Sequence, residues 1–485
     1  MTLKIQSKNA ITLISLVVTI IVLLILSGVA LTMLTGENGI LSMAKKAREK
    51  TEEAQADEQQ KLLMLEAISS RSETEYKGIK IPAGYTPTKR EGEDEVNTGL
   101  VITDSKGNEW VWIEVTADFS SCTTDAQIET ALREYADTIF TEQEKNKKIG
   151  WEDRWYDKLG TIYNGEDYSE IKYIVADTNK TAETRFNEAQ IYYGTLYTKT
   201  GESYNNIDQN ATYEFGTTYY CKITDKLNDD KGCGLTYSEY NNNKSKMLQS
   251  IKNNGGFYIG RYEVGYIDST KRTGGNANTA PTQTPVIKQN AYPYNFVTCS
   301  QAEKLVESLS SGSSDKTASL MFGLQWDLVL KFLKEKDSTI NIANSTTWGN
   351  FRDVEFKVDR GEWAKYEGTA ASTGIFYKFN DTAHYDKIYF KDKTKHGYNS
   401  SVSNENNGRV LLTTGAADRN CTCNIYDLAG NIWEWTLERA SHSVFFCAKR
   451  GGGFVNDGTD YPASSCSGDT AVYHTSALGF RASLY

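Results

Sequence analysis

The first long feature of the sequence is an apolar run over residues 11–34, which contains 24 residues and no charged side chain. About 20 residues of α-helix span the hydrocarbon core of a bilayer, so this run is typical of a membrane-spanning helix. Lys4 and Lys8 precede it and no acidic residue does, which predicts a cytoplasmic N-terminus and an external bulk. A buried core helix and a cleaved secretory signal are the alternatives for the same pattern.

Residues 36–75 follow with a helical pattern. Apolar or small side chains recur mostly every three or four residues, and Lys and Glu fill the positions between them. This stripe consists of Ile40, Ala44, Ala47, Thr51, Ala54, Leu65 and Ile68. The pattern predicts a helical stalk or, as the alternative, a surface helix packed on the next domain.

From about residue 76 the pattern changes to short strands and turns. Alternating apolar residues flank a Gly/Asn turn at residues 105–108 and predict a β-hairpin over residues 99–115. Residues 256–264 are expected to form another strand. Residues 120–245 show weaker patterns and are interpreted as an insertion of unknown role.

Three helices are expected in this part of the chain. Residues 125–140 predict the first. The second opens at Cys299, with Ser300 as the N-cap and Glu303 three residues further on. Residues 319–327 open the third.

Composition and charge exclude several classes of function. The chain has 53 basic and 63 acidic residues, a net charge of −10, which does not suit a nucleic-acid partner. The four His residues show no metal-ligand spacing, and no phosphate-binding loop or nucleophile elbow is present. Eight cysteines could pair in an exported chain. A bond from Cys421 or Cys423 to Cys447 or Cys466 is expected, and Cys299 is interpreted as a buried thiol.

The N-terminal segment resembles type IV pilin-like proteins. The resemblance rests on Lys8, Asn9 and Ala10 before the apolar run that begins at Ile11. It implies cleavage between Ala10 and Ile11 by a prepilin peptidase, and other pilin-like subunits as partners. Ala10 stands where the family usually has Gly, and Ser15 where it usually has the Glu that takes part in filament assembly.

Two later blocks resemble the formylglycine-generating, or sulfatase-modifying factor, family. They are the run DLAGNIWEW at residues 427–435 and the ending formed by RGG at 450–452 and GFR at 479–481. The resemblance implies an α+β fold of the C-type lectin-like type with a large insertion. In structural terms, Gly451–Gly453 allow close backbone approach to large rings, and Arg481 offers five donors to buried carbonyl groups.

The predicted organisation follows from both resemblances. It comprises a leader at 1–10, a transmembrane pilin-like helix at 11–35, a helical stalk at 36–75, the first part of the C-type lectin-like domain at 76–119, the insertion at 120–245 and the main part of the domain at 246–485.

The same resemblance suggests metal positions. Asp427, Gly430, Ile432 and Glu434 match a structural calcium site, with two carboxylates and two backbone carbonyls as hard oxygen ligands. The copper-binding cysteines of the family's oxidases fall on Asn456 and Tyr461, which cannot hold Cu(I) as thiolates. We therefore expect no copper and no formylglycine-forming activity.

The last loop region is a candidate ligand-binding surface. Residues 451–480 contain no Lys, Glu, Gln, Met or Trp, the pattern left when retroelements diversify asparagine codons of a related domain; Gly-rich and Ser-rich loops that avoid these residues are the alternative. Tyr with small polar residues suits adaptable contacts. The candidate residues are Asn456, Asp457, Thr459, Asp460, Tyr461, Ser464, Ser465, Asp469, Tyr473 and His474.

These features predict a single-pass cell-membrane protein, or a subunit of a surface filament, with its bulk outside the cell. Its C-terminal loops would bind an external protein or glycan. Two alternatives remain open: an exported enzyme of the same family with altered chemistry, and a structural minor pilin.

Overall fold

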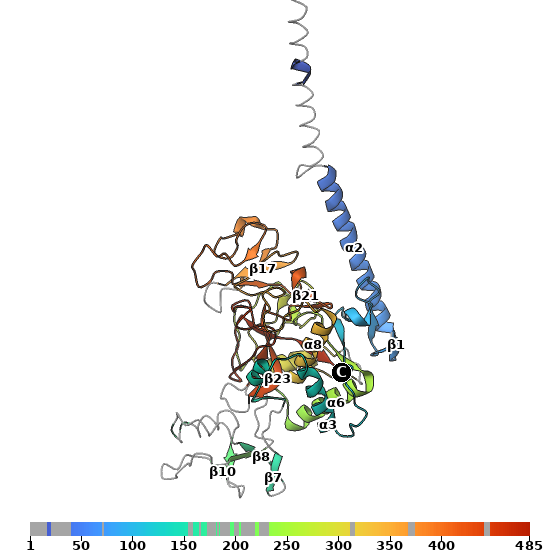
Figure 1. Ribbon diagram of the computed structural model, residues 1–485, viewed down its shortest axis with the longest axis vertical. Coiled ribbons are helices and arrows are strands. Elements are labelled where there is room, and N and C mark those ends of the chain that lie inside the picture. Colours follow the sequence, from blue (N-terminus) through green and yellow to red (C-terminus); the bar gives the residue numbers. More distant parts are fainter. Residues whose placement is uncertain are drawn as a thin grey trace, which may run out of the picture. The chain divides into compact units, whose positions relative to one another are not determined.

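The computed structural model (Figure 1) falls into two compact units, residues 1–62 and 63–485. The residues that it describes are 17–20, 40–69, 72–153, 159–163, 166–171, 181, 184, 195–197, 203–204, 219–222, 232–310, 316–366, 374–440 and 447–485.

The predicted leader and most of the predicted membrane helix lie outside the described residues. Residues 17–20 are helical. Among the helices of the described ranges, none combines the length and the apolar character that crossing a membrane requires. The membrane span therefore stays a prediction.

Helix α2 occupies Ile40–Ser69, inside the segment predicted as a stalk. At its end Leu63 and Ala67 are buried, whereas Leu65 and Ile68 are exposed. The prediction that Leu65 and Ile68 belong to the packed stripe is therefore wrong. Leu63 and Ala67 stand four residues apart, so they share the helix face that packs within unit 63–485.

A six-stranded sheet forms the centre of unit 63–485 and joins early strands to the C-terminus. Strand β12 pairs antiparallel with β5 on one side and with the C-terminal β27 on the other. The predicted hairpin is confirmed as β4 and β5, paired antiparallel. The strand order is β15 (Ala318–Leu320), β27 (Ala482–Leu484), β12 (Gly256–Gly260), β5 (Glu109–Glu114), β4 (Val101–Asp104) and β3 (Tyr85–Pro87).

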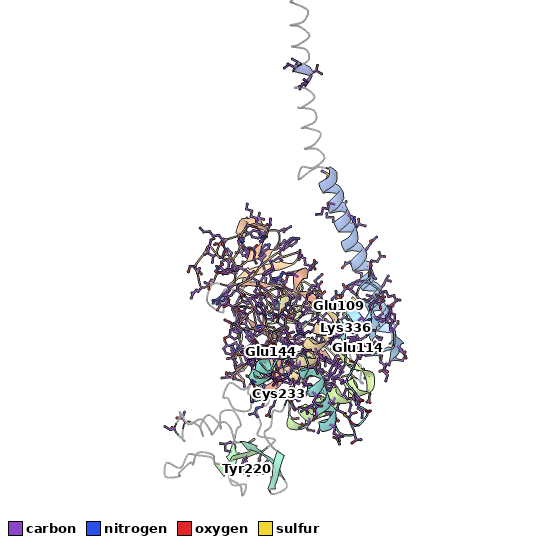
Figure 2. The ribbon with its side chains drawn as sticks, in the orientation of Figure 1. Glu109, Glu114, Glu144, Tyr220, Cys233 and Lys336 are labelled. Carbon is purple, nitrogen blue, oxygen red and sulfur yellow. The ribbon has the colours of Figure 1, made fainter. Side chains whose placement is uncertain are left out.

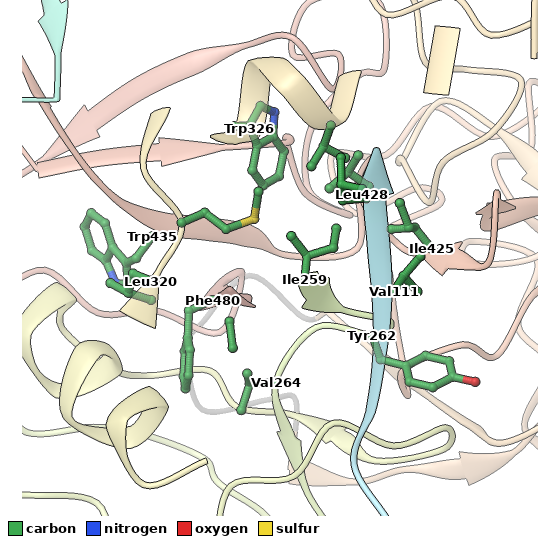
Figure 3. Packing of buried hydrophobic residues seen from close by; sticks show 14 of the residues in the cluster. Val111, Ile259, Tyr262, Val264, Leu320, Trp326, Ile425, Leu428, Trp435 and Phe480 are labelled. Carbon is green, nitrogen blue, oxygen red and sulfur yellow. The ribbon is translucent and has the colours of Figure 1, made fainter. Parts of the chain in front are cut away.

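A second sheet carries the aromatic run. Strand β23 pairs antiparallel with β24 and parallel with β26. Trp435 is fully buried and Trp433 nearly so; Figure 3 shows Trp435 in the core with Leu320 and Phe480. The strands are β25 (Cys466–Asp469), β24 (Cys447–Arg450), β23 (Trp433–Ala440) and β26 (Leu478–Phe480), with β6 (Trp151–Glu152) also paired to β23.

Smaller sheets complete the described strands. Residues within the predicted insertion supply one of them, in the order β10 (Ser203–Tyr204), β9 (Leu196–Tyr197), β11 (Tyr219–Lys222), β8 (Glu166–Ile171) and β7 (Leu159–Tyr163). The remainder are β1 (Thr74–Tyr76) with β2 (Ile79–Ile81), β13 (Gly265–Tyr266) with β14 (Tyr292–Pro293), β16 (Glu355–Phe356) with β19 (His396–Gly397), β17 (Glu362–Lys365) between β18 (Tyr377–Lys378) and β20 (Val410–Leu412), and β21 (Cys421–Thr422) with β22 (Ile425–Tyr426).

The helices of unit 63–485 follow the predictions with local corrections. The N-cap of α7 is Thr298, whose side chain accepts from Gln301 N, rather than Ser300. The start predicted for the next helix contains strand β15, and that helix begins at Gly323. The α-helices are α3 (Asp125–Asp137), α4 (Glu142–Lys147), α6 (Tyr237–Asn254), α7 (Cys299–Glu307) and α8 (Gly323–Lys336), and the 3-10 helices are η1 (Val96–Thr98), η6 (Thr382–His384) and η7 (Asp418–Asn420).

The predicted disulfide is not formed. Cys421, Cys423, Cys447 and Cys466 are all free thiols. The Cys466 thiol instead donates to Glu438, 3.4 Å away. The interpretation of Cys299 as a buried thiol is confirmed.

Residues of the predicted insertion are built into the core. Helix α3 packs against α6 and α8. The buried Asp153 carboxylate accepts from Gly323 N (2.6 Å) and Leu324 N (2.8 Å), the first two amides of α8. It also pairs with Arg133 of α3 at 3.2 Å. Asp153 thus satisfies orphan donors and places a negative charge at the positive end of the helix.

Asp153→Ala should lower the free energy of unfolding by about 2 kcal/mol, because two buried amides lose their acceptor. Asp153→Asn keeps an acceptor and should lose less. Urea unfolding of both variants measures the difference. The control is Asp118→Ala, an exposed acid expected to change stability by no more than about 0.5 kcal/mol. Equal stability of Asp153→Ala and the native chain would contradict the capping role.

Candidate functional site

A cluster of buried charged residues connects the strands that support the C-terminal loops. Arg481 lies between β26 and β27, and its Nη2 donates to Glu434 Oε1 at 2.7 Å. Its other donors reach Gly260 O (3.0 Å) and Tyr426 O (2.9 Å). The predicted role of Arg481 as a donor to buried carbonyls is therefore confirmed.

Two further carboxylates share this cluster. Glu263 accepts from Asn431 Nδ2 (2.7 Å) and from Ile432 N (3.2 Å). Burial raises the pKa of Glu263 well above its ordinary value, and the charges of Asp427 and Glu434 add to the rise. Burial also raises the pKa of Asp427 to about 6. Burial and mutual repulsion therefore both disfavour the charged forms of these carboxylates.

The predicted calcium ligands do not form an open oxygen site. Asp427 Oδ2 accepts from Gly415 N (2.7 Å) and Oδ1 from Asn420 Nδ2 (3.2 Å). Both oxygens of Glu434 accept from Arg481 Nε at 3.1 Å. Two of the four predicted ligands, Asp427 and Glu434, are therefore engaged by protein donors that Ca²⁺ would have to displace. These contacts do not test the backbone carbonyls of Gly430 and Ile432, so the calcium site stays a prediction that this geometry disfavours.

Glycines bring the loop after β24 close to the core. Gly452 has φ +74°, and a Cβ there would lie 2.2 Å from the carbonyl oxygen of Tyr461. Gly451 has φ +93°, and its Cβ would lie 3.2 Å from the Trp326 ring. The predicted close approach of this glycine run is confirmed, and it allows residues 460–466 to fold back along β24.

The first two candidate ligand residues serve the fold. Trp433 Nε1 donates to Asn456 Oδ1 at 2.8 Å. Arg352 donates to Asp457 through Nε (2.7 Å) and Nη2 (2.5 Å). The side chains of Asn456 and Asp457 are therefore engaged in positioning the loop.

A second group lies around Lys449. Its ammonium group pairs with Asp469 and stands 5.4 Å from the centre of the Tyr473 ring. His474 Nδ1 contacts Val472 O at 2.9 Å. Together with the exposed Thr459, these residues do not line the pocket formed by the remaining candidates.

Four candidates converge on one pocket of about 310 Å³: Asp460, Tyr461, Ser464 and Ser465. The Tyr461 ring packs edge-on against Trp433, with 5.7 Å between the ring centres, and 42% of the residue is exposed. Tyr461 can therefore contact both the core and a ligand.

The opposite wall comes from the predicted insertion, which sequence reasoning did not assign to a site. Phe140, Glu144, Lys147 and Lys148 line it, with Glu144 labelled in Figure 2. Glu144 Oε2 accepts from Thr141 N (2.7 Å) in a capping box. The Thr-x-x-Glu spacing of residues 141–144 is a local signal for this helix start, but it does not reveal which loop the helix faces.

Cys466 also lines the pocket, next to a buried ion network. Its thiol donates to Glu438, which forms a paired contact with Arg450 at 2.7 and 2.8 Å. Burial raises the pKa of Cys466 well above its ordinary value, while Arg450 opposes and Glu438 adds to the rise. The thiol is therefore protonated near neutral pH.

Residues 360–483 match the family model of the sulfatase-modifying factor enzyme 1-like domain. The sulfatase-modifying factor-like part of the prediction is thus supported over about a quarter of the chain, within a fold of mixed helices and strands. The match contains the pocket residues 460–466 and Arg481, but not the wall at residues 140–148. The comparison with curated proteins found no match.

Asp427→Asn should reduce the pH dependence of stability. A carboxyl group with a raised folded-state pKa stabilises the fold most below its unfolded value of about 4, and that stability is lost as pH rises through about 6. Between pH 5 and 8 the native chain should lose about 1 kcal/mol more than the variant. Urea unfolding at both pH values measures this, and equal losses would contradict the raised pKa.

Calcium titration tests the donor geometry directly. Adding Ca²⁺ to the metal-free chain should give no binding heat and no rise in melting temperature, because protein donors already occupy both carboxylates. Mg²⁺ at equal concentration is the control for ionic effects. A stoichiometric heat with Ca²⁺ that Glu434→Gln abolishes would instead support the predicted calcium site.

Proposed function

We propose that this protein binds an external ligand through the pocket between residues 140–148 and 460–466. The observation that carries the proposal is the convergence of Asp460, Tyr461, Ser464 and Ser465 on one pocket. These residues lie in the loop region predicted for recognition, on a C-type lectin-like domain without formylglycine-forming activity. Their side chains combine an aromatic surface with short polar groups, which suits selective contacts.

The N-terminal segment supports a place at the cell membrane. The uncharged run over residues 11–34 and the preceding Lys4 and Lys8 favour a single-pass anchor with the binding domain outside. The junction of Ala10 and Ile11 supports processing by a prepilin peptidase. The protein then presents its pocket at the surface, alone or with other pilin-like subunits.

Binding is favoured over redox catalysis by the chemistry at two positions. Where the family's oxidases hold copper with cysteines, Asn456 offers an amide already bonded to Trp433, and Tyr461 offers a phenol. One observation favours the alternative of altered chemistry, since the Cys466 thiol lines the same pocket. Copper-dependent oxidation of a cysteine-containing peptide by the native chain would support that enzyme instead.

Tyr461→Ala should weaken ligand capture at least about tenfold, because it removes the exposed aromatic wall of the pocket. Binding of the full-length chain to glycan and peptide arrays identifies ligands, and titration of the strongest measures the loss. Tyr398→Ala is the matched control, since Tyr398 is similarly exposed and does not line the pocket. Unchanged affinity with an unchanged melting temperature would contradict the proposed surface.

A further inference from the structure

The pocket between residues 140–148 and 460–466 contains charged groups of both signs. Lys148 is already paired within the protein, because its ammonium group contacts Asp327 (2.7 Å) and Asp137 (3.0 Å). Lys147 and Asp460 have exposed side chains and no ion pair to another residue within the described ranges. Both therefore remain available to a ligand.

Glu144 supplies the sharpest observation. Its Oε2 accepts from Thr141 N and Oγ1, each at 2.7 Å. Its Oε1 is buried and has no hydrogen-bond partner among the described residues. A buried carboxylate oxygen without a donor is unfavourable, and a cationic group in the adjoining pocket would offset its negative charge.

The other polar groups of the pocket favour a negatively charged group on the ligand. The ammonium group of Lys147 attracts an anion, and the hydroxyls of Ser464 and Ser465 can donate to it. Lys147 would repel a purely cationic ligand, and Glu144 and Asp460 would repel a purely anionic one. A ligand that carries both charges matches both sets of groups.

Size and apolar surface limit the ligand further. A volume of about 310 Å³ lies at the small end of ligand pockets. Phe140, Tyr461 and Pro462 supply apolar wall, which suits an aliphatic or aromatic side group.

We propose that this pocket binds a free α-amino acid. The ammonium group of the ligand donates to Asp460 and lies in the field of the Glu144 carboxylate, its carboxylate accepts from Lys147 and the serine hydroxyls, and its side group packs on Phe140 and Tyr461. This inference rests on the proposed binding function and names the chemical class of its ligand.

The experiment uses the purified full-length chain and the twenty L-amino acids as probes. Melting temperature and calorimetric titration should identify at least one that binds, with saturation below about 10 mM, a concentration at which even a weak site of millimolar Kd fills. For that amino acid, the amine without the carboxylate and the acid without the amine should each bind at least about tenfold more weakly. Equal binding of either analogue, or no binding by any amino acid, would overturn the inference.

Variants of helix α4 locate the site. Glu144→Gln keeps a capping acceptor but removes the charge, and should weaken amino-acid binding at least about tenfold. Lys147→Met should have a similar effect. Glu142→Gln is the matched control on the same helix, because Glu142 is exposed, pairs with Lys145 and does not line the pocket. Equal loss in all three variants would overturn the assignment to this pocket.

The same measurements separate this inference from the proposed function. If array ligands lose affinity with Tyr461→Ala while no amino acid binds, the binding function stands and the amino-acid assignment fails. If Tyr461→Ala changes neither the affinity for array ligands nor the binding of an amino acid, the proposed binding function and the amino-acid assignment both fail.

Discussion

The buried guanidinium group of Arg481 is the constraint on which the C-terminal half of the fold depends. It joins the carbonyl oxygen of Gly260 in the central sheet to Tyr426 O and to the carboxylate of Glu434 in β23. Removing one partner from such a buried pair leaves an unpaired charge, which is far more unfavourable than loss of a surface ion pair. One side chain near the C-terminus therefore joins the central sheet to strand β23, which supports the loop side of the candidate site.

Trp433 and Gly452 connect this buried cluster to the loop side of the pocket. Strand β23 starts with Trp433, and its indole donates to Asn456 while its ring supports Tyr461. Gly452 allows the backbone at Tyr461 to approach within a distance that no Cβ would permit. The loop is thus shaped by rigid packing, and a rigid loop loses little conformational entropy when a ligand binds.

The second wall depends on a different interaction. Asp153 caps α8 and pairs with Arg133, which ties α3 to the core. Lys148 bonds to Asp327 of α8, and this pair holds the end of α4 next to residues 460–466. The predicted insertion therefore completes the pocket, while the matched family segment provides only the loop side. Ligand choice can change through α4 without a change in the segment that the family shares.

Local signals in the sequence determined the hairpin of β4 and β5, helix α3, the close approach of the glycine run and the buried donors of Arg481. Each depends on periodicity, turn residues or donor chemistry that a short window contains. The tertiary structure alone decided that Asp427 and Glu434 bond to protein donors, that Leu63 and Ala67 form the packed face of α2, and that Glu144 faces the C-terminal loop. These outcomes depend on contacts between residues far apart in the chain, which compete for the same buried space and the same hydrogen-bond partners, and local pattern does not rank such contacts.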